Sequence, residues 1–458
     1  MKITRIKLKG FNQFKDVTLD LTYPRGHEKA GKPLDKICII GQSGTGKTSL
    51  LHLIKWFVSR DNNIGENTRL PVPTGGRVDM DFNVSDLYFR LFNNGINLEY
   101  DSFGFNSSDG GESKISFAEW EQFLKDRLEQ INPLLINYPA ELNQKKNFTG
   151  QQEISSSVNE DELKELKPKQ IIDFAFEDIK KTWKYILKDI SEHRANALLM
   201  KSKIADTVRK NGSDLRKIQE ESVEYDKWLS QNPDPLKILA DKCLNPILAK
   251  LGLKVNLDIS RRSIRELEFI ELITKDGQVV PGDFWSTGTW QLVQTIIPLY
   301  QLKPANAVIL MDEPERSLYP DYQTTIIDTY INLAPKNQFF FATHSPMIAS
   351  CFEPWEIIEL KFDPEGRFVF QDLHYQGENH IDNYKYDPQY LRWDSNLLRI
   401  FGLEKEGGKK RWKALRLLAE LNVRIKKLKA ENNLESAEGQ KLVDENLKIK
   451  EQLDWRIN

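Results

Sequence analysis

Residues 41–48 of this 458-residue chain, Gly-Gln-Ser-Gly-Thr-Gly-Lys-Thr, have the types and spacing of a phosphate-binding loop (P-loop). In the pattern GxxxxGK[ST], backbone N–H groups wrap a triphosphate, the lysine reaches its β- and γ-phosphates, and the last hydroxyl binds Mg²⁺. Those two roles fall to Lys47 and Thr48. The other residues expected to line the nucleotide are Gly41, Gln42, Ser43, Gly44, Thr45, Gly46 and Ser49. We therefore expect ATP and Mg²⁺ as cofactors.

A second set of candidates lies in VILMDEP, residues 308–314, an apolar run that ends in two acids. A carboxylate in this position can hold Mg²⁺ through water, and its neighbour can orient or activate the attacking water. We assign these roles to Asp312 and Glu313. Alone, the segment would be interpreted as an acidic strand end before a proline turn.

A third candidate is His344 in FATHSP, residues 341–346, at the end of another apolar run. A lone histidine is more often structural than catalytic. Here it follows the P-loop and the acidic strand in order, so we expect it to hydrogen-bond the γ-phosphate. The predicted catalytic residues are Glu313, His344 and Lys47.

The stretch GDFWSTGTWQ, residues 282–291, is a fourth candidate, because it leads into the apolar helical run WQLVQTIIPLY. The first N–H groups of a helix attract phosphate. Ser286 could donate a hydroxyl, and Gly288 allows close backbone approach. Alone, the stretch would be a polar turn between two core tryptophans, Trp285 and Trp290, to which the sequence assigns no role beyond packing.

The elements that must position these residues predict a mixed α/β core. Residues 1–21 alternate apolar and polar positions twice, as paired half-buried strands do. The run KICIIG is a buried strand that leads through the P-loop into an apolar helix. Continuous apolar runs such as 308–312 and 338–342 are typical of parallel strands covered on both faces. Further strands are expected near residues 77–84, 96–105, 134–140, 254–259 and 267–277, and a helix at 116–131.

A helical insertion follows the first part of this core. Neither proline nor glycine occurs between Pro168 and Gly212, and an apolar seam recurs in steps of three and four at Ile172, Phe176, Ile179, Trp183, Ile186 and Ile190. A shorter return helix ends before Pro233. One interpretation is a long arm, about 60 Å for about 40 residues. The other is a compact lobe of two or three broken helices.

Composition excludes several other classes of protein. The net charge is −2 and 40% of residues are hydrophobic, so any nucleic-acid binding must come from a local patch. Three scattered cysteines indicate neither a disulfide framework nor a zinc site. We expect no membrane partner and a cytoplasmic location, because no apolar run of about 18 residues appears. The basic segment 406–429 could contact nucleic acid, but an amphipathic helix packed on protein is the preferred interpretation.

The ordered set of motifs resembles the ABC-type ATPases, in particular the branch that includes the RecF, SMC and OLD proteins. The resemblance covers residues 1–365 and implies an ABC-type ATPase head, a mixed central sheet with flanking helices, plus a helical insertion and a helical C-terminal tail. It implies that Ser286-Thr-Gly288 is a signature loop, that residues 315–320 are a D-loop, and that Gln144 is the metal-binding Q-loop glutamine. Trp285 stands where relatives carry leucine, and Tyr319 where many carry histidine.

The resemblance also implies partners. Ser286 and Gly288 would cap the γ-phosphate of a second subunit, so ATP would join two heads in a homo-oligomer. We expect a head at 1–160 and 233–365, a coiled-coil-like insertion at 161–232, and a charged helical region at 366–458 for partner binding or oligomerisation.

The distance between the P-loop and the signature loop separates members of the branch. It is too long for a transporter head and too short for an SMC arm, and no nuclease motif follows residue 365. The layout is similar to stand-alone ATPase subunits of bacterial antiphage systems of the Septu, Septu-like retron and PARIS types. The expected function is an ATPase whose assembly controls a separate nuclease or toxin. The alternative is a RecF- or RecN-like repair ATPase that acts directly on DNA.

Overall fold

The computed structural model describes most of the chain, in two compact units. Within the described part, contacts group residues Met1–Gln389 into one unit and Tyr390–Asn458 into another. No helix in the described part is long and apolar enough to cross a membrane. The described residues are 1–59, 77–84, 87–93, 104–106, 112–114, 133–142, 170–175, 179–210, 215–257, 270–403 and 407–453.

The first unit is built on one mixed sheet, whose 13 described strands have the order β7-β6-β5-β4-β1-β2-β16-β15-β3-β14-β13-β8-β9. One half is antiparallel and contains β1 (Lys2–Phe11), β2 (Phe14–Asp20), β4 (Arg77–Val84), β5 (Leu87–Asn93), β6 (Gly104–Asn106) and β7 (Glu112–Lys114). The other half is parallel and contains β3 (Lys36–Gly41), β8 (Leu135–Tyr138), β9 (Ile171–Asp173), β13 (Val308–Asp312), β14 (Gln338–Ala342) and β15 (Ile357–Phe362). Strand β16 (Val369–Asp372) joins the halves.

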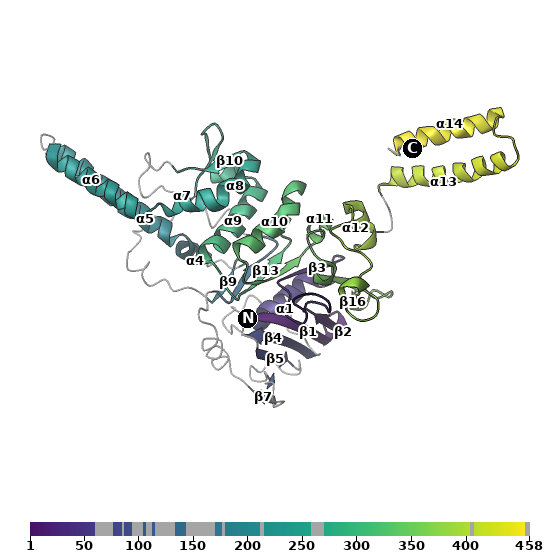
Figure 1. Cartoon of the computed structure of the whole chain (residues 1–458), viewed down its shortest axis with the longest axis horizontal. Helices are drawn as coiled ribbons and strands as arrows, with labels where there is room; N and C mark the ends of the chain where they lie inside the picture. Colours follow the sequence, from purple (N-terminus) through teal and green to yellow (C-terminus); the bar gives the residue numbers. More distant parts are fainter. Residues whose placement is uncertain are drawn as a thin grey trace. The chain divides into compact units, whose positions relative to one another are not determined.

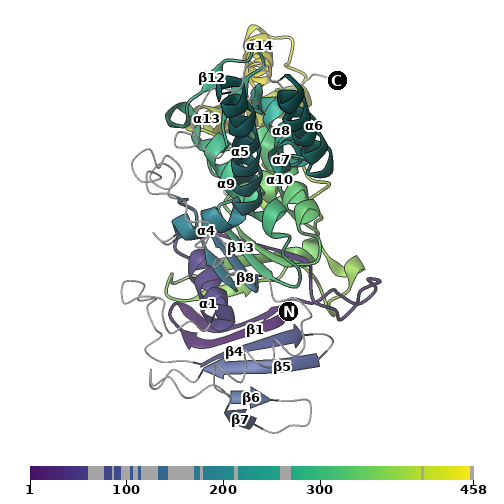
Figure 2. The same cartoon turned by 90° about the vertical axis from the view of Figure 1, so that its left-hand side faces the viewer.

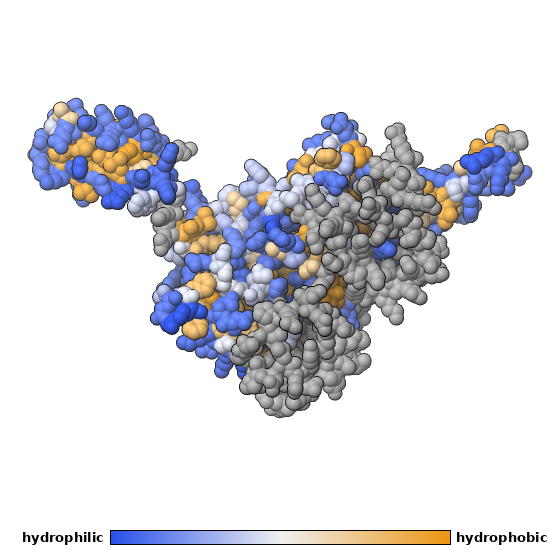
Figure 3. Space-filling model, turned by 180° about the vertical axis from the view of Figure 1, so that it is seen from behind, coloured by the Kyte–Doolittle hydropathy of each residue, from blue (hydrophilic) through white to orange (hydrophobic). Residues whose placement is uncertain are grey.

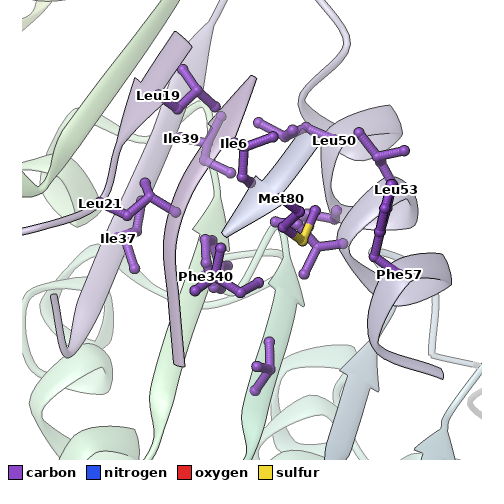
Figure 4. Packing of buried hydrophobic residues seen from close by; sticks show 14 of the residues in the cluster. Ile6, Leu19, Leu21, Ile37, Ile39, Leu50, Leu53, Phe57, Met80 and Phe340 are labelled. Carbon is purple, nitrogen blue, oxygen red and sulfur yellow. The ribbon is translucent and has the colours of Figure 1, made fainter. Parts of the chain in front are cut away.

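Helices cover both faces of the parallel half, as the continuous apolar runs predict. Helix α1 (Lys47–Ser59) lies on one face, and α9 (Thr287–Leu302) and α10 (Pro320–Leu333) lie on the other (Figure 2). Side chains of β1, β2, β3, β14 and α1 form a buried cluster on the first face (Figure 4). On the second face, Phe341 of β14 stacks on Tyr330 of α10, with 6.5 Å between ring centroids. The expected α/β class with a mixed central sheet is confirmed.

The insertion differs from a single long helix. Ile172, the first residue of the expected seam, lies in strand β9, which pairs in parallel with β8. The helical part consists of α4 (Ile179–Ile186) and α5 (Lys188–Lys210), which break at Leu187. Two adjacent β-branched residues beside an exposed strand edge favour pairing over helix. The expectation that the helical seam begins at Ile172 is therefore wrong, and the long helix of the first interpretation is broken at Leu187. Phe176 lies outside the described residues.

Helices α5 and α6 (Leu215–Gln231) pack against each other as an antiparallel pair (Figure 1). The ring of His193, near the start of α5, hydrogen-bonds the carbonyl of Asn232 at 3.0 Å, and Thr207 near its end donates to Glu221 at 3.0 Å. No described residue of α6 is fully buried. At the base of the pair, Gln301 of α9 donates to the carbonyl of Ile186 at 3.4 Å.

Short elements connect this pair to α9. They are α7 (Pro235–Leu239), the π-helical turn η1 (Ala240–Leu244), α8 (Asn245–Leu248), the 3₁₀ turn η2 (Ala249–Leu251), and a small sheet of β10 (Leu253–Val255), β11 (Leu272–Thr274) and β12 (Val279–Val280). The helix expected at 116–131 lies outside the described residues. The boundaries expected at residues 161 and 366 both fall within the first unit, because β9 and β16 belong to its sheet.

The second unit contains α12 (Trp393–Arg399) and a hairpin of α13 (Lys409–Ala430) and α14 (Ala437–Gln452). Leu418 and Leu421 of α13 pack on Ile449 and on Leu453, which follows α14. The apolar stripe of α13 thus packs on protein, as the preferred interpretation held. Apolar side chains of this hairpin also gather on one outer face among hydrophilic ones (Figure 3, at the left).

Candidate functional site

The P-loop connects the end of β3 to the start of α1. The ammonium of Lys47 donates to the carbonyls of Gly41 at 2.9 Å and Gln42 at 3.0 Å, so it lies folded over the loop. Gly44 and Gly46 have φ angles of 86° and 92°, a backbone conformation that side chains with a Cβ rarely adopt. Thr45 is fully buried and donates to Gln42, whereas Ser43 and Thr48 are exposed and Ser49 is half-buried.

The three catalytic candidates reach this loop because their strands are neighbours. Strands β3, β14 and β13 lie side by side and parallel, with Ala342 opposite both Ile39 and Asp312. The carboxyl ends of parallel strands meet at one edge of a sheet, which is where α/β folds bind ligands. The structure therefore brings Lys47, Asp312, Glu313 and His344 to one edge.

Asp312 is the residue best placed to hold a metal ion. Thr48 donates its hydroxyl to Asp312 at 2.7 Å. Burial raises the pKa of Asp312, and the charge of Glu313 raises it further, while Thr48 and Lys47 act in the opposite direction. Two acids crowded in a partly buried site favour a bound cation. This donor set fits Mg²⁺ held by Thr48 and Asp312, and the ion when bound polarises phosphate oxygens.

Glu313 has an unusual backbone. Its φ angle of 49° is in the left-handed region, and its N–H donates to the carbonyl of Ala342 at 2.8 Å. Such a conformation costs a non-glycine residue about 1 kcal/mol or more and persists only where the surroundings enforce it. The position thus carries backbone strain beside the predicted metal site.

His344 lies at the same edge of the sheet. Burial lowers its pKa and the charge of Lys47 lowers it further, against a smaller opposite effect of Glu313. A neutral imidazole carries one donor and one acceptor nitrogen. Burial also lowers the pKa of Lys47, which nearby Asp312 and Glu313 counteract. The electrostatic contacts place His344 and Lys47 in one site.

A 3₁₀ turn, η4 (Gly282–Phe284), precedes the expected signature loop, and the two tryptophans fix this turn to α9. Trp285 donates its ring N–H to the carbonyl of Val280 at 2.9 Å, and Trp290 donates to the carbonyl of Gly282 at 3.1 Å. Their rings contact each other, with 4.5 Å between centroids. Both indole N–H groups thus form hydrogen bonds with backbone carbonyls, in addition to the packing of the rings. The sequence did not indicate these bonds.

Ser286 and Gly288 lie at the first turn of α9. Ser286 is the exposed N-cap residue, and its hydroxyl accepts from the N–H of Thr289 at 3.1 Å. A Cβ on Gly288 would lie 2.5 Å from the carbonyl oxygen of Ser317. The close approach of α9 to the D-loop of the same chain therefore explains why this position is a glycine. The predicted contacts of both residues with a partner's phosphate remain predictions.

The D-loop contacts several further elements through residues that sequence reasoning did not single out. Gln291 of α9 donates to the carbonyl of Pro314 at 2.9 Å. Arg316 donates to the carbonyl of Ala140 at 3.0 Å and to the carboxylate of Glu141 at 2.9 Å, just after β8. A spacing rule could not find these side chains, because their partners are distant in sequence. Gln144, the expected Q-loop residue, lies outside the described residues.

The chain is similar to known proteins in two of three comparisons. Residues 1–349 match the family described as AAA ATPase domain. One similar solved structure is an SMC head bound to the C-winged helix domain of ScpA, with 14% identity and a TM-score of 0.43, covering 81% of this chain and 98% of that one. Another is the SMC head domain with an extended coiled coil bound to the C-terminal domain of ScpA, from Pyrococcus furiosus, with 13% identity and a TM-score of 0.40, covering 81% of this chain and 96% of that one. The comparison with curated proteins gave no match. The family match covers about three quarters of the length of this chain. The chain therefore belongs to the AAA ATPase domain family and is an ATPase.

Proposed function

We propose that ATP joins two copies of this chain through their signature loops, and that this assembly controls a separate nuclease or toxin in antiphage defence. The observation that carries the first part is a pair of exposed aromatic residues. Phe284, beside the signature loop, is 79% exposed, and Tyr319 of the D-loop is 70% exposed. Aromatic side chains are enriched at the centre of protein interfaces. The two segments lie close together, since a Cβ on Gly288 would meet the carbonyl oxygen of Ser317.

In this proposal each composite site takes residues from two chains. Lys47, Thr48 and Asp312 of one copy bind ATP and Mg²⁺, Glu313 orients the water, and His344 contacts the γ-phosphate. Ser286 and Gly288 of the other copy cap that phosphate. Hydrolysis removes the γ-phosphate that bridges the copies and releases them.

The effector is proposed to be a separate protein, because the described residues offer no nuclease centre. Their one candidate metal cluster is Glu359, Asp372 and His374. Lys361 bridges it, with its ammonium 2.9 Å from the Glu359 carboxylate and 2.6 Å from the Asp372 carboxylate. Lys361 thus already supplies positive charge to two of the three members.

The dimer is tested by measuring mass in solution with and without ATP. Glu313→Gln, which should bind ATP without hydrolysing it, is expected to double its mass with ATP. Phe284→Ala or Tyr319→Ala in the same background should weaken dimerisation about tenfold each, as loss of an interface aromatic does. Glu313→Gln that stays monomeric at saturating ATP would refute the dimer. Mg²⁺-dependent DNA cleavage by the purified chain alone would refute a separate effector.

The second candidate, a RecF- or RecN-like ATPase that acts on DNA, is favoured by the surface of α13. This helix carries one acidic residue, Glu420, and basic residues at 409–411, 413, 416, 424, 426, 427 and 429. Basic side chains on one helix bind phosphates in a salt-dependent manner. ATP hydrolysis that rises sharply with DNA ends, and DNA binding that falls steeply with salt, would favour this function over effector control.

A further inference from the structure

We propose that Glu315 is a positioning residue for ATP hydrolysis, which holds the turn containing His344. The inference rests on the proposed role of His344 at the γ-phosphate. It adds a residue of the D-loop that touches neither nucleotide nor metal but determines where the histidine lies.

The contact is made by a single carboxylate oxygen. Oε1 of Glu315 accepts the hydroxyl of Thr343 at 2.6 Å and the backbone N–H of His344 at 3.1 Å. The Thr343 hydroxyl in turn accepts the N–H of Ser345 at 2.9 Å. Glu315 therefore fixes three consecutive residues directly after β14, with His344 in the middle.

A second path leads back from the turn to the D-loop. Ser345 donates its hydroxyl to the side chain of Gln323 in α10 at 2.7 Å. The amide of Gln323 donates to the carbonyl of Leu318 at 3.0 Å, and the N–H of Leu318 donates to the carbonyl of Glu315 at 2.9 Å. The turn and the D-loop are thus joined at two points by a closed ring of hydrogen bonds.

The environment of Glu315 is costly for a residue with only a packing role. Burial raises its pKa, against the hydrogen bonds from Thr343 and His344. Its other oxygen, Oε2, is buried and has no hydrogen-bond partner within the described part of the chain. A buried polar atom without a partner destabilises the fold. The two bonds on Oε1 are therefore the structural reason for a carboxylate here.

These contacts make His344 respond to the D-loop. Glu315 lies between Pro314 and Arg316. Pro314 is contacted by Gln291 of α9, the signature helix, and Arg316 contacts the segment after β8. A shift of the D-loop moves the carboxylate and with it the backbone of His344. A partner that docks on the D-loop would thereby adjust the residue at the γ-phosphate.

The test measures kcat and KM for ATP with the full chain. Glu315→Ala should lower kcat about 10- to 100-fold, the range for lost hydrogen bonds to a charged acceptor, with KM changed less than about threefold. Thr343→Val, which removes the hydroxyl and keeps the shape, should lower kcat about tenfold. Thr343→Ser, which keeps the hydroxyl, should restore it. Glu356→Gln alters a buried carboxylate elsewhere in the unit and should leave kcat unchanged.

A double-mutant cycle tests whether Glu315 acts through His344. If Glu315 acts through His344, then Glu315→Ala should cause little further loss in a His344→Ala background. Full additivity, or wild-type kcat in folded Glu315→Ala or in Thr343→Val, would overturn the inference. Should Glu315→Ala fail to fold, the pair Thr343→Val and Thr343→Ser decides. Unchanged kcat in His344→Ala would instead show that the proposed role of His344 is wrong.

Discussion

Replacing Gly288 by alanine tests the close approach between the signature helix and the D-loop. The added Cβ would lie 2.5 Å from the carbonyl oxygen of Ser317. Ordinary carbon–oxygen contacts are about 3.3 Å or longer, so the two backbones must separate by about 0.8 Å. Ser317 cannot yield alone, because its φ angle of 62° and the Leu318-to-Glu315 hydrogen bond fix a tight turn. The displacement should therefore reach the whole D-loop.

The substitution has two opposing effects on the free energy of unfolding. Overpacking costs about 1–3 kcal/mol, whereas alanine is about 1 kcal/mol more favourable than glycine inside a helix. The net loss in the free energy of unfolding should be at most about 2 kcal/mol. Catalysis is more sensitive, since a misplacement of about 1 Å can cost about a hundredfold in rate. Because the D-loop adjoins Glu313, we expect turnover to fall about 10- to 100-fold while the monomer still binds ATP.

The assay combines thermal unfolding, titration with a fluorescent ATP analogue and steady-state hydrolysis. Gly408→Ala is the matched control, because a Cβ there meets nothing within 4 Å, and its turnover should equal that of the wild type. Gly288→Val should be worse than Gly288→Ala, since it is larger and disfavoured in a helix. Wild-type turnover in Gly288→Ala would refute the argument from close approach. Loss of ATP binding in a folded variant would show that the effect reaches the P-loop instead.

Three further predictions concern Trp290, Glu356 and the second unit. Trp290→Phe removes the N–H donated to the Gly282 carbonyl and should lower the free energy of unfolding by about 1–3 kcal/mol in urea titrations; an unchanged value would show that the bond contributes nothing. Burial raises the pKa of Glu356 to about 7, so the folded state holds this proton more tightly than the unfolded chain and loses stability as pH rises from about 4.5 to 7. Glu356→Gln cannot ionise, so its stability relative to the wild type should rise by up to about 3 kcal/mol between pH 5 and 8, and parallel pH curves would contradict this. Deleting residues 390–458 removes the second contact-defined unit and should leave ATP hydrolysis intact but abolish capture of the effector in pull-downs; retained capture would refute a docking role for this unit.

The sequence predicted the parts of the site that depend on local patterns. A strand, a glycine loop and a helix follow directly around Lys47, Asp312 ends β13, and His344 follows β14, so periodicity and motif predicted where these residues lie. Strand β9 was missed because its pairing with β8 overrides a helical spacing that begins at Ile172. The bonds of Glu315 were missed for a related reason. Their partners lie 28 and 29 residues away, and only the neighbouring positions of β13 and β14 bring them together.

The close contact of Gly288 with Ser317 also bears on how such chains evolve. A glycine whose added Cβ would lie 2.5 Å from a carbonyl oxygen can be exchanged only if the opposing loop changes its path. Ser317 and Glu315 belong to the same D-loop, which Gln291 of α9 also contacts through the carbonyl of Pro314. Single substitutions among them should therefore be deleterious in isolation and tolerated in combination. Among homologous chains, the signature helix and the D-loop should covary as one block, and swapping either segment alone between relatives should give inactive chimeras.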